Sequence, residues 1–91
     1  MKTAQLRIIG KVQGVWYRAS AKDKALSLGL KGKVWNEPDG NVGAIIQGRE
    51  EEVSTFVEWC KHGPPLAVVT EVIVEEVSYE FAFTSFEITK M

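Results

Sequence analysis

The residues best suited to chemistry lie in one stretch near the N-terminus, Gly10-Lys11-Val12-Gln13-Gly14-Val15-Trp16-Tyr17-Arg18. Gly14 has no Cβ, so the loop can turn several backbone N–H groups toward one point. We expect this loop to open onto a helix, whose first turn adds N–H groups and a positive dipole end. Arg18 supplies a guanidinium that can bind an oxyanion with two hydrogen bonds. The stretch therefore predicts a phosphate cradle formed by Gln13, Gly14, Val15, Trp16, Tyr17 and Arg18.

No activated nucleophile accompanies this cradle. No Ser, Cys or His near it has a matching base, and the sequence has no cluster of Cys and His with metal-ligand spacing. Chemistry here would have to proceed by binding charge and placing water. That suits phosphoryl hydrolysis of an activated ester, because positioning and electrostatic stabilisation supply most of the acceleration in phosphoryl transfer.

The cradle is expected to join a strand to a helix. Before it, apolar and polar residues alternate over residues 4–12, which predicts a strand buried on one face. After it, apolar residues recur near the helical spacing and predict a helix over residues 18–28, with Gly29 as its C-terminal stop.

The rest of the chain repeats this strand and helix pattern. A second strand is expected over residues 30–36, a hairpin turn at Pro38-Asp39-Gly40, a third strand over 41–47, a second helix over 50–61, a fourth strand over 68–77 and a short last strand over 86–88. This order predicts an α+β, ferredoxin-like βαββαβ sandwich, with an antiparallel sheet, two helices on one face and a short extra C-terminal strand. We expect residues 1–91 to form a single domain.

This topology brings a second polar residue to the cradle. The first two strands run in the same direction with the third between them, so their C-terminal ends lie at the same edge of the sheet. Asn36 closes the second strand and shares a face with Val34. If Val34 points toward the helices, the side chain of Asn36 emerges on the side of the cradle loop.

Composition narrows the class of protein further. The 91 residues carry a net charge of -1, which gives no general attraction to nucleic acid or to an anionic membrane. No stretch approaches the ~20 apolar residues of a membrane span, and the N-terminus lacks a signal-peptide pattern. The single cysteine, Cys60, lies on the apolar stripe of the second helix and is expected in the core. We expect a cytoplasmic monomer that binds neither nucleic acid nor membrane.

The sequence closely resembles the acylphosphatase family. The signature G-x-V-Q-G-V-x-[FY]-R is met in full by Gly10 to Arg18, and a second signature, G-x-V-x-N, by Gly32-Lys33-Val34-Trp35-Asn36. Gly63-Pro64-Pro65 and the acidic, valine-rich fourth strand also look like the family, so the resemblance spans essentially the whole chain.

The resemblance implies hydrolysis of the carboxyl-phosphate bond of a small-molecule acyl phosphate, without metal, cofactor or covalent intermediate. By carry-over, Arg18 binds the phosphate with the loop N–H groups, and Asn36 orients the attacking water. A substrate phosphate oxygen is our hypothesis for the proton acceptor, and inorganic phosphate or sulfate would inhibit. Trp16 departs from the small residue common at its position, so we expect it to narrow the entrance of the cradle or to pack against the acyl group.

Two other classes of function compete with this one. A regulatory module of the same fold could bind acyl or carbamoyl phosphate without turnover, like the resembling domain at the start of hydrogenase maturation proteins; we count the lack of a downstream domain against it. RNA-binding modules share the topology, and Trp35 with Ile9 and Ile45 could offer bases a surface on the open sheet face. The aromatic motif of those modules is absent and the charge balance is wrong, which disfavours this function.

Overall fold

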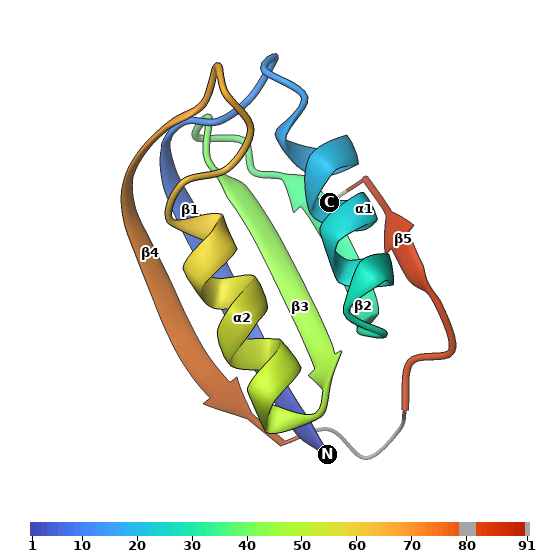
Figure 1. Ribbon diagram of the computed structural model, residues 1–91. Coiled ribbons are helices and arrows are strands. Elements are labelled where there is room, and N and C mark those ends of the chain that lie inside the picture. Colours follow the sequence, from blue (N-terminus) through green and yellow to red (C-terminus); the bar gives the residue numbers. More distant parts are fainter. Residues whose placement is uncertain (79–81, 91) are drawn as a thin grey trace.

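Five strands form one sheet in the order β4-β1-β3-β2-β5, and both helices cover the same face of it (Figure 1). The computed structural model of the protein describes residues 1–78 and 82–90. Its elements are β1 (Lys2–Lys11), α1 (Tyr17–Ser27), β2 (Lys31–Asn36), β3 (Val42–Gly48), α2 (Glu50–Cys60), β4 (Val68–Val77) and β5 (Phe86–Ile88).

The ferredoxin-like fold predicted from the sequence is confirmed. Strand β3 lies between β1 and β2 and is antiparallel to both, so β1 and β2 run in the same direction, and β4 pairs antiparallel with β1. The short last strand β5 pairs in parallel with β2, which makes the sheet mixed. The C-terminal ends of β1 and β2 consequently lie at the same end of the sheet (Figure 1).

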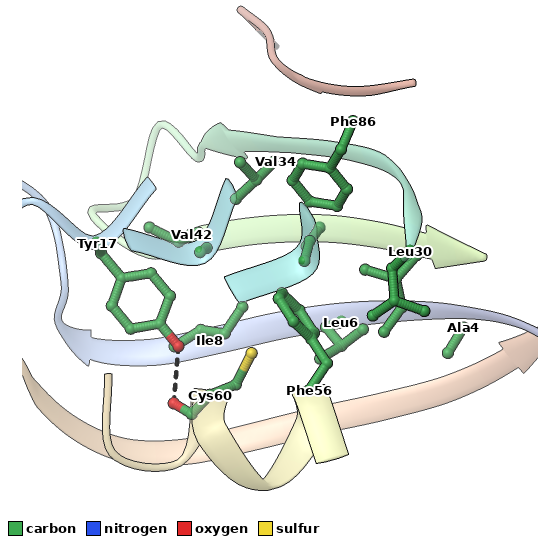
Figure 2. Close-up of a cluster of buried hydrophobic side chains, with 14 of the residues drawn as sticks. Ala4, Leu6, Ile8, Tyr17, Leu30, Val34, Val42, Phe56, Cys60 and Phe86 are labelled. Atoms are coloured by element: carbon green, nitrogen blue, oxygen red, sulfur yellow. Dashed lines mark hydrogen bonds between the residues drawn. The ribbon is translucent and has the colours of Figure 1, made fainter. Parts of the chain in front are cut away.

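The core forms between the sheet and the two helices, and its residues follow the alternation of the strands. On β1, Ala4, Leu6 and Ile8 are buried, while the residues between them are exposed. The rings of Phe56 on α2 and Phe86 on β5 lie 6.3 Å apart between their centroids, so the last strand is packed into the same core (Figure 2). Neither α1 nor α2, the two helices of the described residues, has the length and apolar character needed to cross a bilayer.

The start of α1 is fixed to the end of α2 by Tyr17. Its ring is fully buried, and its hydroxyl donates a 2.7 Å hydrogen bond to the backbone carbonyl of Cys60, the dashed line in Figure 2. The ring also contacts Trp59, with centroids 5.5 Å apart. The N-terminal end of α1, which follows the predicted cradle, therefore has a fixed position on the core.

Replacing Tyr17 with Phe is expected to lower the free energy of unfolding by about 1–2 kcal/mol, because it leaves the buried Cys60 carbonyl without its donor. The ring contacts with Trp59 remain, so the loss isolates the hydroxyl group. Urea unfolding of the two proteins measures the difference, and equal stabilities would mean that this hydrogen bond contributes nothing net.

Candidate active site

The loop between β1 and α1 alternates buried and exposed residues. Val12 and Val15 are buried in the core, whereas Gly14 and Trp16 are exposed. Both exposed residues have left-handed backbone conformations, with φ of 74° at Gly14 and 68° at Trp16. Left-handed residues in a loop can turn neighbouring N–H groups toward a common side, as in an anion-binding nest.

The N–H groups of this loop and of the first turn of α1 have no hydrogen-bond acceptor in the part of the chain that the structure describes. Among residues 1–78 and 82–90, no backbone or side-chain atom accepts a hydrogen bond from the N–H groups of residues 14–19, and α1 has neither a side-chain cap nor an acidic residue in its first turn. Helix α2 differs, since Glu50, Glu51 and Glu52 occupy its first turn. The positive end of α1 is therefore left without compensation by the described part of the chain, as an anion site requires.

Arg18 supplies a positive charge next to these N–H groups in the sequence. The chain has three arginines, and Arg7 and Arg49 form ion pairs with acidic side chains. Within the described residues, the half-buried Arg18 has no acidic partner. Gly14 and residues 16–19 line an open pocket of about 390 Å³ together with Val12 and Ile88. The structure thus places Gly14, Trp16, Tyr17 and Arg18 around one cavity.

Asn36 has the strand position and the face that were predicted from the sequence. It is the last residue of β2, pairs with Val42 of β3, and shares the helix-covered face of the sheet with the buried Val34. Its side-chain oxygen Oδ1 is buried and has no hydrogen-bond partner among the described residues. An unsatisfied buried carbonyl oxygen costs about 1–3 kcal/mol, so this amide is kept at the expense of stability. Asn36 is not among the residues that line the 390 Å³ pocket.

The side chain of Gln13 joins the cradle loop to the hairpin that follows Asn36. Its amide nitrogen Nε2 donates two hydrogen bonds of 2.8 Å, to the backbone carbonyls of Glu37 and Asn41. Only the backbone N–H of Gln13 is therefore left for the phosphate contact predicted from the sequence. The two carbonyls belong to the main chain of a distant turn, so no residue pattern could have revealed this bridge.

Replacing Gln13 with Ala is expected to lower kcat about tenfold and the free energy of unfolding by about 1–2 kcal/mol, because the loop and the end of β2 lose both connecting hydrogen bonds. Steady-state kinetics and urea unfolding measure the two effects. Since the loop N–H groups and Arg18 remain, inhibition by phosphate should weaken less than kcat falls. A variant with wild-type kcat would show that the bridge does not position the site.

The two titratable groups buried near the end of α2 are held in their neutral forms. Burial raises the pKa of the Cys60 thiol to about 12, and it raises the pKa of the Tyr17 hydroxyl above its usual range. Neither is activated as a nucleophile. Within residues 1–78 and 82–90, no group of three His, Cys, Asp or Glu side chains is placed to hold a metal ion.

The fold and the pocket define a class: a small α+β protein with a cavity at the junction between its first strand and first helix. The chain matches the sequence profile of the Acylphosphatase family over residues 4–88, and it belongs to that family. It is 47% identical over 90 residues to an acylphosphatase of Methylococcus capsulatus, covering 99% of this chain and 98% of that one. The resemblance seen in the motifs is confirmed, and so is the prediction that the chain is an enzyme, an acylphosphatase.

Solved structures agree with this assignment. A crystal structure of acylphosphatase from Bacillus subtilis superposes with a TM-score of 0.94 at 32% identity, covering 98% of this chain and 99% of that one. Full-length HypF, in its phosphate- and nucleotide-bound form, superposes with a TM-score of 0.89 at 32% identity. That match covers 98% of this chain but 12% of HypF.

Proposed function

We propose that this enzyme hydrolyses the carboxyl-phosphate bond of acyl phosphates by direct attack of water, releasing a carboxylate and inorganic phosphate. The proposal is supported by one pocket that Gly14 and residues 16–19 line, where the described residues provide no acceptor for the N–H groups and no acidic partner for Arg18. Together they offer a dianionic phosphoryl group several donors and one fixed positive charge.

The first role of the site is to bind and stabilise the phosphoryl group. The loop N–H groups and Arg18 hold its non-bridging oxygens, where negative charge is spread in the transition state of phosphoryl transfer. These donors are already fixed by the buried Val12, Val15 and Tyr17, so little reorganisation is needed when the substrate binds.

The second role is to place the water. The buried, unpartnered Oδ1 of Asn36 can accept a hydrogen bond from a water molecule and direct its oxygen toward phosphorus. The new bond forms between this oxygen and phosphorus while the bond from phosphorus to the acyl oxygen breaks. The departing carboxylate takes the electron pair and needs no proton, because carboxyl groups have a low pKa. A phosphate oxygen of the substrate receives the proton of the water.

The test is hydrolysis of benzoyl phosphate by the purified protein, with and without a chelator. We expect equal rates in both conditions, with inorganic phosphate and sulfate as competitive inhibitors. A folded protein without activity would contradict the proposal, and loss of activity with the chelator would contradict the metal-independent mechanism. Thermal stabilisation by phosphate without any hydrolysis would instead support the binding-module alternative.

A further inference from the structure

We propose that Trp16 and Ile88 form an apolar acyl-binding subsite next to the phosphate cradle, which selects acyl phosphates with an aromatic acyl group. The proposal rests on the proposed function, because it assigns the phosphoryl end of the same substrate to Arg18 and the loop N–H groups. It adds the part of the substrate that the phosphate contacts cannot distinguish.

Trp16 is a large aromatic side chain that lies mostly outside the core. It is 76% exposed, and it is the one residue other than glycine with a positive φ among the described residues. Such a backbone costs about 1–3 kcal/mol, and residues that adopt it cluster at active sites and ligand-binding sites. The other two tryptophans are used internally, since Trp35 packs on Gly43 and Trp59 contacts the core rings. Trp16 thus has a strained backbone, and its side chain is not part of the hydrophobic core.

Ile88 places a second apolar side chain in the same pocket. It is the last residue of β5, opposite Val34 of β2, and it is 41% exposed. Phe86, two residues earlier on the same face of the strand, is buried in the core. The apolar face of β5 therefore continues from the core into the pocket, where Ile88 and Trp16 both line the space beside Arg18.

An acyl phosphate has a charged phosphate end and an acyl end. This pocket is lined by the charged Arg18 and by the apolar Trp16 and Ile88. When the phosphoryl group is bound to the N–H groups and Arg18, the acyl group of the bound substrate extends into the rest of the cavity. Trp16 and Ile88 line this part of the cavity with apolar side chains. The volume of about 390 Å³ is in the range of small-ligand sites. A flat aromatic acyl group can stack on the indole ring, whereas an acetyl group offers it little surface.

The experiment compares kcat/KM for benzoyl phosphate and acetyl phosphate in four proteins: wild type, Trp16→Asn, Trp16→Phe and Leu66→Asn. Asn tolerates the left-handed backbone of position 16 but removes the ring. Leu66 is a matched control, because it is 68% exposed but does not line the pocket. We expect the ratio of benzoyl to acetyl kcat/KM to fall about fivefold or more in Trp16→Asn, the size of one lost aromatic contact. Trp16→Phe should restore most of the ratio, and Leu66→Asn should leave it as in wild type.

A second readout does not depend on turnover. Benzylphosphonate and methylphosphonate carry the same anionic group without a bond to hydrolyse, and their dissociation constants can be measured by calorimetry. Wild type should bind benzylphosphonate more tightly, and Trp16→Asn should lose this preference. Selective binding without hydrolysis would refute the proposed function but not the subsite. An unchanged ratio in Trp16→Asn, for the substrates and the phosphonates alike, would overturn the subsite.

Discussion

Replacing Arg18 with Gln is expected to lower kcat/KM for benzoyl phosphate by about a thousandfold or more, because it removes the one charged donor at the developing phosphoryl charge. Inhibition by inorganic phosphate should weaken in the same variant, since Arg18 is proposed to bind the product as well as the transition state. The side chain forms no ion pair with the described residues, so its loss should change the free energy of unfolding little. Kinetics, phosphate inhibition and urea unfolding test the three parts separately.

The matched control is Lys22→Gln, which removes the same charge one helical turn further along α1. Its kcat/KM should stay within about twofold of wild type, because a screened surface charge contributes little. If both variants lost activity to the same extent, net charge would explain the effect. An Arg18→Gln variant that kept its turnover would contradict the proposed cradle.

Replacing Asn36 with Ala is expected to lower kcat about a hundredfold or more while the inhibition constant of phosphate stays within about twofold of wild type. The amide is proposed to hold the attacking water and not the phosphate, which explains why kcat should fall while the inhibition constant of phosphate is maintained. Stability should be maintained or increased, because the substitution removes a buried Oδ1 that has no partner among the described residues. Steady-state kinetics with phosphate inhibition, combined with thermal unfolding, measures all three quantities.

Asn41→Ala serves as the control for this variant. It removes the same amide group near the start of β3, where Oδ1 accepts a 3.4 Å hydrogen bond from the backbone N–H of Gly10. The backbone carbonyl that binds Gln13 is unchanged. Most of the turnover should therefore remain in Asn41→Ala. Equal weakening of phosphate binding in Arg18→Gln and Asn36→Ala would contradict the division of roles.

Much of the fold could be predicted because its signals are local. The alternation in β1 and the apolar spacing in α2 each identify an element, and the boundaries of all predicted elements lie within one or two residues of those observed. The direction of β5 could not be read locally, since parallel pairing with β2 is decided by contacts between distant segments. The requirement for glycine at position 10 also depends on a distant segment, because a Cβ there would collide with the backbone carbonyl of Val68 across the sheet. That close approach explains a glycine which the sequence could assign only to a motif.

The strand position of Asn36 could be predicted because it follows from topology. Asn36 was assigned to the end of β2 on the face of Val34, and the structure has it there. The left-handed backbone of Trp16 could not be expected, because tryptophan has no preference for that conformation. The hydrogen bonds of Gln13 and the position of Ile88 at the pocket could not be expected either, since both depend on contacts between segments far apart in the chain.

The most direct test of the mechanism is a crystal structure of the enzyme with sulfate or phosphate bound. We predict that the anion accepts hydrogen bonds from the N–H groups of the cradle loop and from the Arg18 guanidinium. The Oδ1 atom of Asn36 should then lie one bridging water away from the bound anion. An anion bound elsewhere on the protein, or an Asn36 side chain directed away from the anion, would contradict the account.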